Sequence, residues 1–216
     1  MKAIIFDMDG LMIDSERLYF QSEREVARRF GKEVKDETLW KMMGRKPIES
    51  MQVFSEDLGL DIPSEELVEI RDELYGEKLK NDLVPMKGLF EMLEEFKGKL
   101  VLSIATGSPV KLLDLILDRL DIRNYFDVLQ ASDDIVNGKP DPEIYLKTIE
   151  KLGTNPEECI VLEDSSNGAR AGKNAGCYTI AIPSEYTKMQ DFSFADYIAA
   201  DLNDARMHII SSFIKG

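Results

Sequence analysis

The first fifteen residues, Met1-Lys-Ala-Ile-Ile-Phe-Asp-Met-Asp-Gly-Leu-Met-Ile-Asp-Ser15, set the arrangement of the rest of the chain. The apolar run Ala3–Phe6 ends abruptly at Asp7, which is typical of a strand buried on both faces of a parallel sheet. In open α/β sheets, ligands bind just beyond the carboxyl ends of the strands. Asp7 and Asp9 stand at such an end, and an extended backbone would turn both side chains to one face. Gly10 follows, where the chain must turn.

These two carboxylates repel each other unless a cation joins them, since no Lys or Arg lies in the next several residues. A divalent cation with oxygen ligands fits this pattern, and oxygen-only ligation favours Mg²⁺. The alternative is an ordinary strand-to-turn junction, in which Asp and Gly are common. The rest of the sequence has to distinguish the two interpretations.

Size and charge restrict the class of protein. The chain has 216 residues, enough for one large domain or two unequal ones. Its net charge of −14 argues against nucleic acid and against a membrane surface as partners. An acidic protein that handles an anionic substrate needs local cations or a metal at its site.

The two cysteines and the single histidine restrict the class of protein further. Cys159 and Cys177 each lie in an apolar stretch, which predicts buried thiols in a reducing, cytoplasmic setting rather than a disulfide framework. The apolar run before Asp7 is too short for a signal peptide, and we expect no membrane-spanning segment. His208, near the C-terminus, is a poor candidate for a catalytic histidine.

The spacing of apolar residues predicts two kinds of structure along the chain. A block of helices alone is expected at about 15–30, 36–43, 47–58 and 63–80. Strands are expected at about 100–105, 126–130, 159–162, 178–182 and 195–199, with helices between them. We therefore predict an α/β fold in which residues 1–14 and 83–216 form a Rossmann-like parallel sheet covered by helices. Residues 15–82 would form an inserted helical cap, either gating the sheet's ligand edge or simply packed as a subdomain.

More polar residues follow the predicted strands. Thr106-Gly107-Ser108 stands between a strand and a helix, where hydroxyls and amides bind phosphate or merely cap the helix. Lys139, held between Gly138 and Pro140, fits either of two roles, to neutralise an anion or to stand solvated at the surface. Glu163 and Asp164 end an apolar strand as Asp7 does, and alternation would let only one of them share its inner face. Their alternative role is that of acids at a helix N-terminus.

The sequence resembles the haloacid dehalogenase (HAD) superfamily in four motifs that follow one another in the same order. They are Asp7-x-Asp9-Gly, Thr106, Lys139 and Glu163-Asp164. The helical insert after the first motif resembles its α-helical-cap subfamily. The resemblance implies that Asp7 is a nucleophile that forms an aspartyl-phosphate and that Asp9 is the general acid and base.

The same resemblance implies roles for the other strand-end residues. Mg²⁺ would be held by the Asp7 carboxylate, the Asp9 carbonyl and Asp164, with Glu163 nearby. Thr106, Gly107 and Ser108 would bind the phosphoryl oxygens, and Lys139 would balance the charge, in keeping with the needs of phosphoryl transfer.

The details of the sequence favour one activity within this superfamily. Asp9 points to phosphate monoesters, hence to a phosphatase acting on a small phosphorylated metabolite such as a sugar phosphate or a nucleotide-like ester. The alternative β-phosphoglucomutase has a histidine and an arginine where this chain has Tyr19 and Pro47. A phosphate-binding protein without turnover is a further alternative, although no motif is missing.

Similarity to the pseudouridine-5′-phosphatase branch implies that Tyr19, Arg45 and Lys46 contact the substrate from the cap. The alternative is that the two cations are solvated loop residues. We expect a monomer or a weak dimer.

Overall fold

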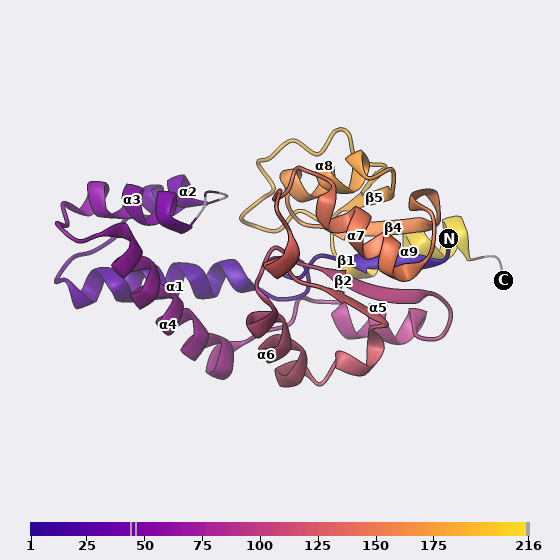
Figure 1. Cartoon of the computed structure of the whole chain (residues 1–216), viewed down its shortest axis with the longest axis horizontal. Helices are drawn as coiled ribbons and strands as arrows, with labels where there is room; N and C mark the ends of the chain where they lie inside the picture. The colour runs from indigo at the N-terminus through magenta and orange to yellow at the C-terminus, as the bar shows by residue number, and fades with distance from the viewer. Residues whose placement is uncertain (44, 46, 215–216) are drawn as a thin grey trace. The chain divides into compact units, whose positions relative to one another are not determined.

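The computed structural model describes residues 1–43, 45 and 47–214, and the chain divides into two compact units (Figure 1). The core unit consists of Met1–Asp14 and Val84–Gly216, and the helical unit consists of Ser15–Leu83. The boundary between them falls directly after the first strand-end motif.

A six-stranded parallel sheet forms the centre of the core unit. Its strands are β1 (Ala3–Phe6), β2 (Val101–Ala105), β3 (Val128–Gln130), β4 (Cys159–Glu163), β5 (Tyr178–Ala181) and β6 (Tyr197–Ile198). Their order in the sheet is β3-β2-β1-β4-β5-β6. This arrangement confirms the predicted Rossmann-like α/β core. The outermost strands β3 and β6 are shorter than the apolar patterns suggested, because each pairs on one side only.

Helices cover the sheet on both faces (Figure 1). They are α5 (Leu89–Phe96), α6 (Val110–Leu120), α7 (Glu143–Leu152), α8 (Ser166–Asn174) and α9 (Leu202–Phe213), with 3₁₀ turns at η1 (Arg123–Tyr125), η2 (Ser132–Asp134) and η3 (Pro156–Glu158). Helix α7 lies against β2 and β3, α8 lies against β4 and β5, and α5 packs on α9. Covered on both faces, β1 and β4 are buried along their whole length, which explains why their sequences are continuous apolar runs.

The register of the central strands brings the polar motifs to one edge. Phe6, the last residue of β1, lies beside Ile104 of β2 and Leu162 of β4. The residues that follow each of these strands must therefore meet. Asp7 continues the pairing, since its backbone N–H donates to the carbonyl of Leu162 at 3.0 Å.

The helical unit contains α1 (Ser15–Arg29), α2 (Asp36–Met42), α3 (Pro47–Leu58) and α4 (Ser64–Asp82). Helix α4 packs on α1 and α3, and α3 also packs on α2, so that their apolar faces form a separate small core. Among the described residues of the whole chain, no helix is long and apolar enough to cross a membrane.

Both cysteines are free and buried, as predicted. Burial raises the pKa of Cys159 to about 11 and that of Cys177 to about 12. Such thiols remain protonated and unreactive at neutral pH.

Candidate active site

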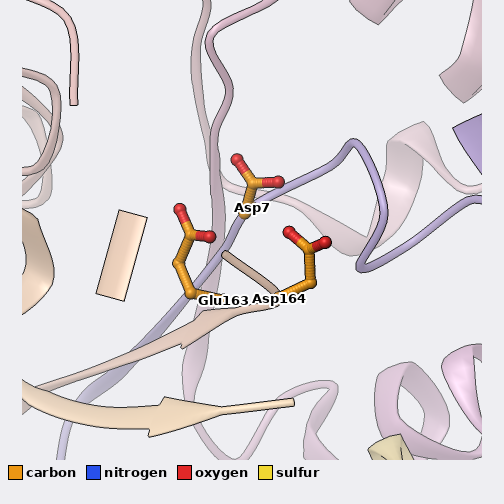
Figure 2. A group of neighbouring side chains, drawn as sticks. All are labelled: Asp7, Glu163 and Asp164. Atoms are coloured by element: carbon orange, nitrogen blue, oxygen red, sulfur yellow. The ribbon is translucent and has the colours of Figure 1, made fainter. Parts of the chain in front are cut away.

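Three carboxyl groups meet at the carboxyl ends of β1 and β4 (Figure 2). Asp7 follows β1, Glu163 is the last residue of β4, and Asp164 comes next. One oxygen from each lies within 4.8 Å of the others, and all three residues are buried. Alternation predicts that only one of Glu163 and Asp164 shares the inner face of the strand, yet both place an oxygen in this group, because β4 ends at Glu163 and strand alternation does not extend to Asp164.

Lys139 supplies the positive charge among them. Its ammonium lies 2.5 Å from Oδ1 of Asp7 and 2.6 Å from Oε1 of Glu163, and it also donates to the carbonyl of Ala105 at 3.3 Å. The Lys139 side chain is only 15% exposed, so water screens these ion pairs little. Lys139 is far from Asp7 and Glu163 in the sequence, yet its ammonium group lies between their carboxylates.

The pKa values of Asp7 and Lys139 depend on each other. Burial raises the pKa of the Asp7 carboxyl well above its usual range, although the Lys139 ammonium lowers it. Burial alone would lower the pKa of Lys139, but Asp7 and Glu163 together raise it well above its usual value. The lysine is therefore charged at every physiological pH.

Glu163 is fixed by hydrogen bonds to both of its oxygens. Oε1 accepts from the Tyr145 hydroxyl at 2.7 Å as well as from Lys139, and Oε2 accepts from the backbone N–H and the hydroxyl of Ser165. Burial, with the Glu163 carboxylate, raises the pKa of Tyr145, so its hydroxyl stays protonated and donates. Gly168 of α8 leaves room for this carboxylate, because a Cβ there would lie only 1.8 Å from Oε1.

Sequence reasoning assigned no role to Tyr145, Ser165 or Gly168. Tyr145 stands on the buried face of α7, six residues after Lys139, and Gly168 stands in the first turn of α8. Glu143 was also missed. It accepts hydrogen bonds from the backbone N–H groups of Val136 and Asn137 and so fixes the segment that leads to Lys139. These bonds and the Lys147 ammonium lower its pKa to about 2.

Asp9 has different partners from Asp7. Its Oδ2 accepts from the hydroxyl of Thr106 at 3.2 Å and from that of Ser108 at 2.7 Å. The backbone N–H of Ser108 in turn donates to the Thr106 hydroxyl at 3.0 Å, while Gly107 is exposed. The motif that follows β2 therefore orients the second carboxylate of the first motif.

The donor set at this edge suits a hard divalent cation. One oxygen from each of the three carboxyl groups lies within 4.8 Å of the others, near enough for a single cation to share them, and Mg²⁺ prefers oxygen ligands. Three carboxylates against one ammonium leave an excess of negative charge, which a divalent ion would balance. Glu163 already accepts hydrogen bonds on both oxygens, so Asp7 and Asp164 are the better ligands of the three.

The residues expected to bind substrate from the cap lie in the helical unit. Tyr19 and Arg45 line the same cavity of that unit. The Tyr19 ring stacks on that of Tyr75, with centroids 3.8 Å apart and planes at 11°. Lys46 lies outside the described residues.

Comparisons with known proteins agree with this geometry. The family described as "Haloacid dehalogenase-like hydrolase" matches residues 4–182. A phosphorylated carbohydrates phosphatase of Thermotoga maritima is 39% identical over 181 residues, which cover 82% of each protein. Hexitol phosphatase B of Escherichia coli is 32% identical over 185 residues, covering 84% of this chain and 83% of the relative.

A solved structure extends the match to the whole fold. It is that of a Thermotoga maritima protein named as a candidate beta-phosphoglucomutase, with a TM-score of 0.85 and 32% identity. The match covers 99% of this chain and 100% of the other. The chain therefore belongs to the haloacid dehalogenase-like hydrolase family, and it is an enzyme of the phosphoric monoester hydrolase class.

Proposed function

We propose that the protein is a Mg²⁺-dependent phosphatase that hydrolyses small phosphate monoesters through an aspartyl-phosphate on Asp7. One observation carries the proposal: the buried Asp7 carboxylate is paired with Lys139 and lies close enough to Asp164 to share a cation with it. Asp7 and Asp164 would hold such a cation, which would supply positive charge to offset that of the phosphoryl group.

The residues of the chain account for both chemical steps. An Asp7 oxygen attacks phosphorus, and the ester P–O bond breaks as the Asp9 carboxylic acid gives its proton to the leaving oxygen. Asp9, now a carboxylate, takes a proton from water, which attacks the same phosphorus and breaks its bond to Asp7. Phosphate is released and both side chains return to their starting states.

The remaining residues at the strand ends position these groups. The hydroxyls of Thr106 and Ser108 hold Asp9 and would turn toward phosphoryl oxygens once substrate is bound, with Gly107 leaving the backbone open between them. Lys139 neutralises charge on Asp7 and on the transferred group, and Glu163 holds Lys139 in place.

The named relatives act on phosphorylated carbohydrates and on hexitol phosphates, which makes a sugar or polyol monophosphate the favoured substrate class. The helical unit would act as the cap, with Tyr19, Arg45 and Lys46 contacting the part of the substrate that bears no phosphate. The enzyme would work in the cytoplasm as a monomer or a weak dimer. In a substrate panel, Arg45→Ala should lower kcat/KM, while Arg29→Ala, at an exposed position of α1, should not.

The test is phosphate release from a panel of sugar phosphates, polyol phosphates and nucleotides, with and without Mg²⁺. EDTA and Asp7→Asn should each abolish release, whereas Asp61→Asn, an exposed aspartate, should not change it. Isomerisation of β-glucose 1-phosphate is measured in parallel. Efficient conversion to glucose 6-phosphate with little free phosphate would make the protein a mutase instead.

A further inference from the structure

Glu163 lies within reach of a cation at the strand ends, but its oxygens are already in use. One of them is within 4.8 Å of an oxygen of Asp7 and an oxygen of Asp164, so distance alone would make Glu163 a third carboxylate ligand (Figure 2). Both Glu163 oxygens nevertheless accept hydrogen bonds from the protein. The side chain is only 1% exposed, so bulk water does not compete for these oxygens. The groups that hold Glu163 therefore decide how many carboxylates a cation meets.

Tyr145 of α7 holds Glu163 through a short hydrogen bond. Its hydroxyl donates to Oε1 at 2.7 Å, whereas the hydroxyl and the backbone N–H of Ser165 donate to Oε2 at 3.1 and 3.3 Å. The Tyr145 side chain is fully buried and packs in the apolar cluster between α7 and the sheet. A side chain in such a close-packed interior has little freedom to turn away from its partner.

Lys139 is the other group that holds Oε1 of Glu163. Its ammonium lies 2.6 Å from this oxygen and also 2.5 Å from Asp7. The ammonium and the Glu163 carboxylate together carry no net charge. The two carboxylates of Asp7 and Asp164 then remain to balance the charge of one divalent ion.

The number of carboxylates that reach the ion bears on which ion binds. Mg²⁺ takes about six ligands in near-octahedral geometry and keeps several waters, whereas Ca²⁺ accepts about six to eight oxygens in a flexible arrangement. A third protein carboxylate therefore favours Ca²⁺ more than it favours Mg²⁺.

We infer that Tyr145 sets the metal selectivity of this site: its hydrogen bond keeps Glu163 on Lys139 and away from the cation, which biases the site toward Mg²⁺ over Ca²⁺. The inference rests on the proposed function, because it takes Asp7 and Asp164 as the carboxylates that hold Mg²⁺. Without the tyrosine hydroxyl, Oε1 would keep Lys139 as its one donor among the described residues. A buried carboxylate oxygen with spare acceptor capacity is costly, and a bound Ca²⁺ would relieve that cost.

The test measures the dissociation constants of Mg²⁺ and of Ca²⁺ by calorimetry for the wild type and for Tyr145→Phe. Phenylalanine keeps the ring, which lies 5.1 Å from the Lys139 ammonium, and removes only the hydroxyl. The ratio of the Mg²⁺ constant to the Ca²⁺ constant should rise about three- to tenfold, the range set by one hydrogen bond. The matched control Tyr178→Phe loses a hydroxyl that bonds to His208 at the other end of the sheet, and its ratio should equal that of the wild type.

Glu163→Gln tests the same inference from the side of the carboxylate. Because Glu163 does not bind the cation in the wild type, this variant should change both dissociation constants by the same factor. Adding Tyr145→Phe to Glu163→Gln should then leave the ratio unaltered, since no charged third ligand is present.

Two results would overturn the inference while leaving the proposed function intact. One is an unchanged ratio in Tyr145→Phe, and the other is a ratio that still rises when Tyr145→Phe is combined with Glu163→Gln. A wild type that binds neither ion would overturn the proposed metal dependence, and the inference with it.

Discussion

Replacing Glu23 by glutamine should stabilise the protein at alkaline pH and change its stability little at acid pH. The Glu23 side chain is buried, and burial raises the pKa of its carboxyl from 4.5 to about 7, although Arg71 and Arg24 lower it. The folded protein therefore keeps a proton on Glu23 over a pH range in which the unfolded chain has released it. Because the folded-state pKa is the higher one, the stability that Glu23 contributes is complete below about pH 4.5 and is lost as the pH rises through about 7.

The size of the effect follows from the shift. A difference of about 2.5 pKa units, at about 1.36 kcal/mol per unit, amounts to about 3 kcal/mol, of which about 2.5 kcal/mol develops between pH 5 and pH 8. Glutamine does not titrate, so the variant should gain that amount over the wild type across this range.

Urea unfolding at several pH values, followed by tryptophan fluorescence, measures this difference. Trp40 is the sole tryptophan and lies on α2, so its signal reports on the unit that contains Glu23. The control Glu25→Gln loses only a surface ion pair, worth about 0–1 kcal/mol, and should show no comparable trend. If the free energy of unfolding of Glu23→Gln differs from that of the wild type by the same amount from pH 5 to pH 8, this explanation is refuted.

Three further changes test the hydrogen-bond network around Glu163. Lys139→Met leaves buried carboxylates unpaired and should cost about 3–5 kcal/mol in urea unfolding at pH 7, with less loss at lower pH. Gly168→Ala places a Cβ against Glu163 and should lower the free energy of unfolding by about 1–3 kcal/mol. It should also weaken Mg²⁺ binding measured by calorimetry. The control Gly76→Ala has open space around it and should leave the free energy of unfolding unchanged or raise it. Tyr145→Phe removes one hydrogen bond and should cost about 0.5–1.5 kcal/mol and lower kcat, so an unaltered kcat would argue against a positioning role.

The position of the site could be predicted from the sequence because strand ends are easy to locate. An apolar run that stops at an acid marks a buried parallel strand, and the carboxyl ends of neighbouring parallel strands lie at one edge. The apolar runs predict strand ends just before Asp7 and Thr106 and next to Glu163, and the register of β1, β2 and β4 brings these ends together.

The partners of these residues could not be predicted, because they depend on side-chain reach in three dimensions. Strand alternation suggested that Glu163 and Asp164 point apart, yet the strand ends between them. Tyr145 looked like an ordinary apolar position of an amphipathic helix, and nothing in its spacing indicates that its hydroxyl reaches Glu163. Glu23 looked like one of many acids on a helix, because burial of a charged residue leaves no mark in a helical pattern.

The identity of the nucleophile is tested most directly by trapping the intermediate. The enzyme is mixed with p-nitrophenyl phosphate and Mg²⁺, quenched in acid during turnover, and digested for mass spectrometry. We predict a phosphoryl group on Asp7 of the wild type. In Asp7→Asn, both this phosphoryl group and phosphate release should be absent. Undiminished release by Asp7→Asn, or a phosphoryl group found on another residue, would contradict the proposed mechanism.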